Sequence, residues 1–378
     1  MDSAEREGLR PKGNVPNLRF PEFQGKWDKC KFRDVCSIST GNKNTQDKID
    51  DGIYPFYVRS QTVERINSWT FDGEAILTAG DGVGVGKVFH HTYGKIGVHQ
   101  RVYILSDFKC DANYLFHFFS SKFYNRVKRM SAKNSVDSVR KEMITDMPLS
   151  LPSHQEQVKI GYLLSLLDER IATQSKIIED LKKLKSAIIE KLYKGIQGTW
   201  YSYRQLFSII NERNKQLEYS NVLSASQERG MVSREDLNLD IHFERSNIST
   251  YKIVKNGDYV IHLRSFQGGF AFSEKTGICS PAYTVLRPNN LLVYGYLSNY
   301  FTSRDFVKSL IIVTYGIRDG RSINVDEWLD MKVVIPSKEQ QTHIVNVIES
   351  IENKIKNEET YSNCLLNQKQ YLLRQMFI

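Results

Sequence analysis

The stretch of sequence that decides the fold occurs twice in the chain. It reads D-M-P-L-S-L-P-S-H-Q-E-Q from Asp146 to Gln157 and D-M-K-V-V-I-P-S-K-E-Q-Q from Asp330 to Gln341. Pro152 in the first copy corresponds to Pro336 in the second, and this pair sets the offset between the copies. The offset holds without a gap for about fifty residues, which indicates an internal duplication.

A long helix is predicted after each copy of this stretch. Apolar residues recur at alternating steps of three and four, which is typical of a coiled-coil seam over about five heptads. Ser153 and Ser337 suit the N-cap positions of these helices. In the first copy the seam consists of Ile160, Leu164, Leu167, Ile171, Gln174, Ile178, Leu181, Lys185, Ile188 and Leu192. The second copy has Ile344, Ile348, Ile351, Ile355, Leu365, Lys369, Leu372 and Met376, with Lys369 where the first copy has Lys185.

Two arrangements of these helices are possible. Each helix packs as a core element inside one globular domain, or the two helices pair with each other. A helix of about 40 residues extends about 60 Å, which is wider than a small domain. The length therefore favours an antiparallel pair.

The regions ahead of the helices also correspond, though more loosely. Residues 71–77 match residues 255–261 at the same offset, and Asn113-Tyr114-Leu115 resembles Gly295-Tyr296-Leu297. Both regions are rich in Val, Ile, Tyr and Phe, with frequent Gly and Asn, which predicts strands with a few helices. The expected fold class is α/β (α+β), with two similar domains separated by two long helices that form an antiparallel coiled coil. The expected boundaries are a flexible N-terminus at 1–13, a first domain at 14–150, a helix at 151–195, a second domain at 196–335 and a helix at 336–378.

Composition sets broader limits. The chain has 378 residues, 40% hydrophobic and 25% charged, and its 52 Lys and Arg against 43 Asp and Glu give a net charge of +9. That balance is consistent with a polyanionic partner. The five cysteines are scattered, without a C-x-x-C pair, which predicts reduced, mostly buried thiols and no metal site. No apolar run approaches the roughly 18 residues that span a bilayer, so we expect a soluble, cytoplasmic protein with no membrane partner.

On these motifs the sequence resembles the specificity subunits of type I restriction-modification systems. The lead-in N-V-P-N-L-R-F-P-E-F-Q-G-K-W, from Asn14 to Trp27, resembles the start of the family's first target-recognition domain. The duplicated P-S-H-Q-E-Q and P-S-K-E-Q-Q resemble the family's P-x-x-x-E-Q signature. The second copy departs from it at Gln340, where the first copy has Glu156.

The resemblance implies a DNA-binding subunit without catalytic activity. Each target-recognition domain would read one half of a bipartite, asymmetric site on double-stranded DNA, and the helices would set the spacing and dock two methyltransferase subunits. Restriction (motor) subunits are further implied partners. The chain itself would bind no cofactor, whereas its partners would use S-adenosylmethionine, ATP and Mg²⁺.

The most conspicuous local motif is T-A-G-D-G-V-G-V-G-K-V, from Thr78 to Val88. It is not a P-loop, because Asp81 occupies the place of the first glycine and Val88 that of the Ser or Thr that binds magnesium. Glycines let a backbone approach a phosphate closely, and a lysine adds charge. The motif is therefore either a plain tight turn or a DNA-backbone contact formed by Gly82, Gly84, Gly86 and Lys87.

Other polar runs are candidate DNA contacts, with solvated loops or surface ion pairs as the alternative. In the first copy they are His99, Gln100, Arg101 and Arg140. In the second copy they are Arg264, Ser265, Gln267, Gly268, Gly269, Arg318 and Arg321. Arg264 would suit guanine and Gln267 adenine.

Motifs of an enzyme are absent from the sequence: it contains no N-P-P-[FYW] motif, nuclease cluster or H-E-x-x-H, and His90-His91 has no carboxylate at useful spacing. The alternative of another class is a coiled-coil scaffold protein with two protein-binding domains.

Replacing Arg264 or Gln267 is expected to relax the reading of one half-site and leave the other unchanged, because a lost bidentate base contact costs roughly 1–3 kcal/mol. Selection on random DNA measures this. Equal weakening of both half-sites would instead make these residues structural or backbone contacts.

Overall fold

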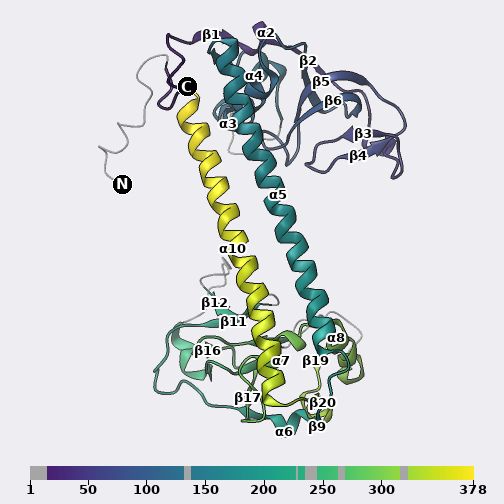
Figure 1. The fold of residues 1–378 in the computed structure, drawn as a ribbon, viewed down its shortest axis with the longest axis vertical. Helices are drawn as coiled ribbons and strands as arrows, with labels where there is room; N and C mark the ends of the chain where they lie inside the picture. Colours follow the sequence, from purple (N-terminus) through teal and green to yellow (C-terminus); the bar gives the residue numbers. More distant parts are fainter. Residues whose placement is uncertain (1–14, 132–137, 227–228, 235–244, 263–268, 316–321) are drawn as a thin grey trace. The chain divides into compact units, whose positions relative to one another are not determined.

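Two long helices dominate the computed structural model, which describes residues 15–131, 138–226, 229–234, 245–262, 269–315 and 322–378. Helix α5 (His154–Tyr193) has 40 residues and α10 (Lys338–Met376) has 39, and they run beside each other in Figure 1. Both begin as predicted. The Ser153 hydroxyl accepts the N–H of Glu156 at 3.4 Å, and the Ser337 hydroxyl accepts that of Gln340 at 3.3 Å.

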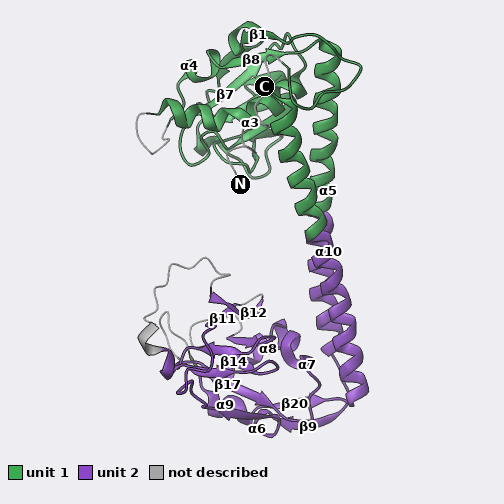
Figure 2. Cartoon of the chain, turned by 90° about the vertical axis from the view of Figure 1, so that its left-hand side faces the viewer, with its two compact units in different colours: residues 1–175, 360–378 green, residues 176–359 purple. Residues whose placement is uncertain are grey.

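The chain divides into two compact units, and the division falls inside each long helix (Figure 2). Unit 1 comprises residues 1–175 and 360–378, and unit 2 comprises residues 176–359. Each unit thus contains part of both helices. The domain boundaries expected from the sequence stay a proposal, and the expected flexible N-terminus at 1–13 lies outside the described residues.

Unit 1 is built on a six-stranded sheet in the order β2-β7-β5-β6-β3-β4, in which only the β3–β6 pair is parallel. The strands are β2 (Ser37–Thr40), β3 (Tyr54–Tyr57), β4 (Glu64–Ile66), β5 (Phe71–Ala79), β6 (Phe89–Val98) and β7 (Val102–Ser106). A separate ladder pairs β1 (Asp28–Lys31) with β8 (Pro148–Leu151). The helices are α2 (Phe32–Val35), η1 (Thr45–Asp47), α3 (Ala112–Met130) and α4 (Lys141–Thr145).

The core of unit 1 includes both long helices. Helix α3 buries Phe118, Phe119 and Phe123, and the start of α5 adds Ile160 and Leu164. The last residues of the chain complete this core: the Phe377 ring is 1% exposed and lies 5.3 Å from the Tyr114 ring and 5.6 Å from the Phe118 ring. A fragment limited to residues 14–150 would therefore lack part of its own core.

Unit 2 has a smaller main sheet than unit 1, with four strands instead of six. Its main sheet has the order β10-β17-β14-β15, formed by β10 (Phe207–Ile210), β17 (Thr284–Pro288), β14 (Tyr259–Ile261) and β15 (Phe270–Phe272). Two-stranded ladders pair β9 (Thr199–Ser202) with β20 (Lys332–Ile335), β11 (Leu223–Ser226) with β12 (Gly230–Ser233), β13 (Lys252–Val254) with β16 (Gly277–Cys279), and β18 (Thr314–Tyr315) with β19 (Ser322–Ile323). The helices are α6 (Tyr203–Leu206), η3 (Arg245–Thr250), α7 (Tyr296–Tyr300), α8 (Arg304–Ser309), η4 (Leu310–Val313) and α9 (Val325–Asp330).

The core of unit 2 is aromatic. The Tyr203 ring stacks on Trp328 at 4.3 Å and 11°, and Phe270 and Phe301 pack beside them. Helix α10 contributes Ile344 and Ile348 to this core.

The interpretation of the helix sequences as one continuous seam needs a correction at their starts. Ile160 and Leu164 in unit 1, and Ile344 and Ile348 in unit 2, belong to the cores of their units. The first turns of each helix are thus core elements, as in the alternative arrangement weighed from the sequence, because each helix begins directly after a strand of its unit. The last turns also reach the cores, through Met376 in unit 1 and Ile189 in unit 2. Between these ends the helices pair, as the expected fold class required.

An ion pair that recurs with the duplication marks the antiparallel pairing. In unit 2 the Lys185 ammonium lies 2.6 Å from the Glu352 carboxylate. In unit 1 Lys369 pairs with Asp168. Lys369 corresponds to Lys185, and Asp168 corresponds to Glu352, at the offset of the duplication, so the duplication preserved a contact between the helices. The two lysines of the seam, Lys185 and Lys369, are explained by these partners.

A buried glutamine joins each long helix to its unit. In unit 1 the Gln157 amide donates to the Pro152 carbonyl at 2.8 Å and accepts the N–H of Asp111, just before α3, at 3.0 Å. In unit 2 Gln341 donates to the carbonyls of Pro336 and Leu291 at 3.0 Å and accepts the N–H of Val293 at 2.8 Å. These bonds satisfy backbone groups that would otherwise be buried without a partner. They give the final glutamine of the duplicated motif a structural role.

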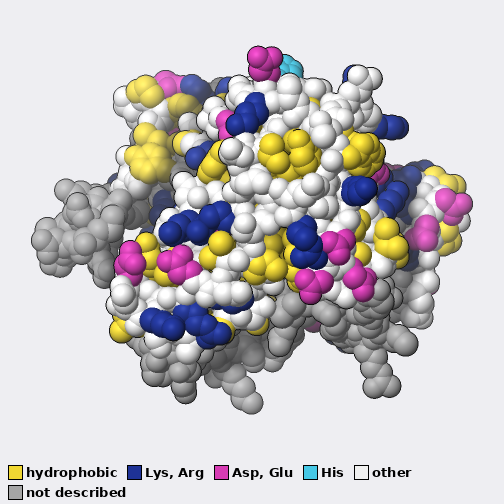
Figure 3. Space-filling model, turned by 90° about the horizontal axis from the view of Figure 1, so that it is seen from below, with side chains coloured by type: hydrophobic (Ala, Val, Ile, Leu, Met, Phe, Trp, Pro, Cys, Tyr) yellow, Lys and Arg dark blue, Asp and Glu magenta, His cyan; other side chains and the backbone are white. Residues whose placement is uncertain are grey.

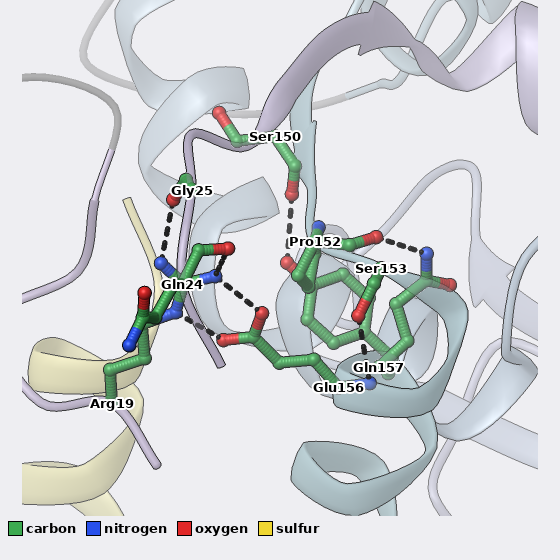
Figure 4. A network of polar contacts seen from close by, with 9 residues as sticks. Arg19, Gln24, Gly25, Ser150, Pro152, Ser153, Glu156 and Gln157 are labelled. Carbon is green, nitrogen blue, oxygen red and sulfur yellow. Dashed lines mark hydrogen bonds and ion pairs between the residues drawn. The ribbon is translucent and has the colours of Figure 1, made fainter. Parts of the chain in front are cut away.

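The glutamate of the motif occurs only in the first copy, as Glu156, where it forms an ion pair. Glu156 accepts two bonds of 2.8 Å from Arg19, and its side chain is 1% exposed (Figure 4). Arg19 also donates to the carbonyls of Gly25 and Gln24. This network fastens the lead-in segment to the start of α5, and the N–H of Leu18 donates to the Gln375 carbonyl of α10 at 3.0 Å.

The second copy has neither the glutamate nor the arginine of this pair. Gln340 is exposed, and the position six residues before Gly198, which corresponds to Arg19 six residues before Gly25, is Leu192. Because the second copy has Leu192 in place of the arginine, the exposed Gln340 side chain has no cation to neutralise. This explains why the second copy departs from Glu156 at this position.

The described helices include none that is long and apolar enough to cross a membrane. All five cysteines are free thiols, with Cys36, Cys110 and Cys279 buried. Burial raises the pKa of each of these three thiols to about 12.

Replacing Glu156 by Gln is expected to reduce the free energy of unfolding by about 1–3 kcal/mol, because the buried Arg19 contacts lose their charged partner. The double variant Arg19→Leu/Glu156→Gln reproduces the second copy, and it is expected to cost less than the sum of the two single changes by about 1 kcal/mol or more. Urea unfolding of the four proteins measures this coupling. The exposed Glu179–Lys183 pair of α5 is the control and is expected to show no measurable coupling. Additive effects at Arg19 and Glu156 would contradict the network.

Candidate nucleic-acid interface

The glycine stretch connects β5 to β6 as a tight turn. Gly82 and Gly86 have φ angles of +76° and +65°, which favour glycine. Gly84 is buried, and a Cβ there would lie 2.4 Å from the Arg59 carbonyl oxygen. The N–H groups of Lys87 and Val88 donate to the Gly84 carbonyl at 3.0 and 2.9 Å. These amides are therefore used inside the turn, and close approach by the protein's own backbone accounts for Gly84.

Two side chains of this turn face solvent. Val83 is 98% exposed, and Lys87 is exposed with its ammonium 5.4 Å from the centre of the Tyr124 ring. Lys87 and the exposed Gly82 can meet a DNA backbone, whereas Gly84 and Gly86 are buried beneath the surface. Of the four residues predicted to contact phosphate, only Gly82 and Lys87 are exposed, so the prediction is kept for these two.

The run His99-Gln100-Arg101 forms the connection between β6 and β7. The N–H of Gly80 donates to the Arg101 carbonyl at 2.7 Å, so this loop lies against the glycine turn. The Gln100 amide donates to Asn44 at 2.6 Å. The Arg101 side chain is 66% exposed.

His99 supports this loop from below. It is 5% exposed, and its Nδ1 accepts the N–H of Arg101 at 3.0 Å. Burial, followed by the nearby charge of Arg59, lowers the pKa of His99, so the neutral ring persists near pH 7. The buried His99 ring thus holds the backbone of Arg101. Sequence analysis predicted that His99 itself contacts DNA, but little of its side chain is exposed to do so.

Arg140 joins the same surface through backbone contacts. Ser138 pairs with Asp81 in a β-bridge, and the N–H of Val139 donates to the Gly80 carbonyl at 2.7 Å. Arg140 follows as the exposed residue ahead of α4. The structure therefore brings together three runs that are far apart in sequence: the glycine turn, residues 99–101 and Arg140.

Sequence reasoning missed two residues of this surface. The Arg59 guanidinium donates to the Asp81 carboxylate at 2.9 Å, and Arg101 Nε lies 3.7 Å from the other Asp81 oxygen. The glycine motif contains Asp81, but both of its partners are distant in sequence, and no local pattern marks Arg59. The statement that His91 lacks a carboxylate was also wrong, because Glu74 lies 3.0 Å from its Nε2 across β5 and β6.

The second copy's candidates are mostly outside the described residues. These are Arg264, Ser265, Gln267, Gly268, Arg318 and Arg321. Gly269 is described and buried, and its carbonyl accepts the N–H of His262 at 2.8 Å where β14 and β15 meet. Gly269 thus extends the hydrogen bonding between β14 and β15.

One described face of unit 2 carries both signs of charge. Figure 3 shows Lys and Arg interspersed with Asp and Glu on the face that lies at the end of α6, β9 and β20. Arg204 there lies 2.8 Å from Asp330. This face does not gather cations, so we assign no nucleic-acid contact to it. Among the described residues, no group of three or more His, Cys, Asp and Glu is placed to hold a metal ion.

The first-copy surface lies in a stretch of the chain that matches a known family model. Residues 24–183 match the family model of the type I restriction modification DNA specificity domain. This stretch contains the whole candidate surface, formed by Arg59, the glycine turn, Arg101 and Arg140.

The chain is also similar to curated specificity subunits. Over 173 residues, 45% of this chain and 38% of the relative, the chain is 28% identical to the type I restriction enzyme EcoDI specificity subunit of Escherichia coli. It is 29% identical over 194 residues to the type I restriction enzyme MjaVIII specificity subunit of Methanocaldococcus jannaschii, covering 47% of this chain and 44% of the relative. The matched stretches span less than half the length of these curated relatives.

Solved structures extend the likeness of fold to the whole chain. The type I restriction-modification system S subunit from M. genitalium has a TM-score of 0.61 at 13% identity, covering 96% of this chain and 99% of that one. A chain from a study of assembly and conformational transition of the type I R-M system has a TM-score of 0.56 at 13% identity, covering 93% and 97%. The resemblance to type I specificity subunits is confirmed, as is the fold class, and these relatives speak against the scaffold alternative.

Proposed function

We propose that this chain reads the DNA sequence for a type I restriction-modification complex and carries out no catalysis itself. The observation that carries the proposal is the exposed cationic surface of Arg59, Lys87, Arg101 and Arg140, which lies in the stretch matched by the specificity-domain model. Double-stranded DNA is the partner that suits it, because arginine and lysine neutralise phosphates and arginine also reads guanine.

The two copies would read different halves of one site. Unit 1 presents the glycine turn and Arg101, whereas the corresponding part of unit 2 has Arg264, Ser265, Gln267 and Gly268 in sequence. Different side chains favour different bases, so the bipartite target is asymmetric in this proposal.

The long helices would set the distance between the two readers and dock the partner subunits. Their charged outer faces and their continuous length support this role. The partners are two methyltransferase subunits and the restriction subunits. S-adenosylmethionine, ATP and Mg²⁺ belong to these partners, and this chain binds none of them.

Mapping of methylated sites in host DNA, with and without an intact copy of this gene, tests the proposal. The expected result is one asymmetric bipartite motif that loses its methylation when the gene is removed. Methyl transfer by the isolated chain would instead support the enzyme alternative, and an unchanged methylation pattern would contradict the DNA-reading role.

The spacer role is tested by lengthening the helices. Because α5 and α10 pair through contacts such as Lys185–Glu352, seven residues are inserted in each helix, between Ile171 and Ile188 and in the paired part of α10. Seven residues preserve the heptad and add about 10 Å. The gap between half-sites is expected to grow by one to three base pairs, about 3.4 Å each, with the bases of either half unchanged.

Methylation mapping of the insertion variant measures the gap. Four-residue insertions are the control, and they are expected to lower activity because they break the seam. An unchanged gap with full activity would mean that the helices do not set the spacing.

A further inference from the structure

The side chain of Asp81 lies between two arginines at the exposed end of the glycine turn. Its Oδ1 accepts from Arg59 at 2.9 Å, and its Oδ2 lies 3.7 Å from Nε of Arg101. The side chains of Arg59 and Arg101 are 45% and 66% exposed, and that of Asp81 is 26% exposed. One carboxylate thus faces two cations at the centre of the candidate surface.

Hydrogen bonds fix the backbone at Gly80 and Asp81, and also that of Arg101. The N–H of Gly80 donates to the Arg101 carbonyl at 2.7 Å, and the Gly80 carbonyl accepts the N–H of Val139 at 2.7 Å. Asp81 itself forms a β-bridge with Ser138. On the other side, the His99 ring accepts the N–H of Arg101 at 3.0 Å. The carboxylate and the arginine backbone are therefore fixed relative to each other.

Stability alone does not account for this arrangement. Exposed ion pairs contribute little to folding, since solvent screens them and ordering long side chains costs entropy. A carboxylate also repels a phosphate backbone, so its place within a phosphate-binding surface opposes general affinity for DNA. A role in base selectivity accounts for the carboxylate, because reading a base depends on the orientation of an arginine side chain and not on the net positive charge of the surface.

We propose that Asp81 is a positioning residue that orients Arg101 toward a guanine in the half-site read by unit 1, with Arg59 completing the contact. Arg101 faces the carboxylate with its Nε, at an ion-pair distance of 3.7 Å, and its two terminal nitrogens are left as donors that match O6 and N7 of guanine. The carboxylate also keeps the arginines from settling on phosphates. This inference rests on the proposed function and adds to it the base and the residue that directs its recognition.

The test compares Asp81→Asn with Asp72→Asn in the full chain, together with the subunits that co-purify with it. Asp72 is exposed on β5, the strand that leads into the glycine turn of Asp81, and both variants remove one negative charge. Binding is measured across a salt series to a duplex with the mapped site and to a random-sequence duplex. Selection from randomised half-sites gives the base preferences.

Asp72→Asn is expected to change both affinities alike. Asp81→Asn is expected to retain or raise affinity for the random duplex and to lower the ratio of specific to random binding about ten-fold, the range of one lost bidentate contact. The preference for guanine at one position of one half-site is expected to disappear, with the other half intact.

A second variant keeps the test decisive if Asp81→Asn fails to fold. Arg101→Lys retains the charge and loses the bidentate geometry, so it is expected to lose the same guanine preference. Retention of that preference by Arg101→Lys, or equal ratios for Asp81→Asn and Asp72→Asn, overturns the inference while leaving the proposed function standing. Absence of any preference for the mapped site in the unsubstituted protein overturns the proposed function, and this inference with it.

Discussion

The buried amide of Gln157, and its repeat Gln341, is the interaction on which the rest of the structure depends. Each long helix begins at a strand of its own unit, and the loop before the next helix of that unit passes close by. The loop presents an N–H group, of Asp111 or Val293, to the protein interior. A buried N–H without a partner costs about 1–3 kcal/mol, and a glutamine at the fourth helical residue can reach it. The duplication retained this glutamine in both copies.

Once the helix start is fixed in each unit, the other features follow. The first turns of α5 and α10 enter the cores through Ile160 and Ile344. Farther along, the helices are free to pair, and the repeated ion pairs of Lys185 and Lys369 align them. The end of α10 then closes the core of unit 1 with Phe377. The candidate surface carried on unit 1 therefore has a defined place relative to the start of its helix.

The sequence was sufficient to predict what repeats and what is periodic. The duplicated motif predicted both long helices and their serine caps, because apolar spacing and capping are local properties. The same pattern could not separate seam from core, since an isoleucine such as Ile160 satisfies either. Polar runs predicted Arg101 and Arg140 as members of a surface, but the Asp81 contact to Arg59 joins distant parts of the sequence through the sheet, which leaves no local signal. The burial of His99 and Gly84 was also unpredictable, because it depends on neighbours such as Tyr57 and Arg59.

Hydrogen exchange of the full chain with Gln157→Leu or Gln341→Leu measures the glutamine constraint most directly. Gln157→Leu is expected to speed amide exchange about ten-fold at the start of α3 and in β8, with α7 and β20 unchanged. Gln341→Leu is expected to do the reverse in unit 2. Unchanged protection at α3 and β8 in Gln157→Leu, and at α7 and β20 in Gln341→Leu, would contradict the role of the motif in joining helix and domain.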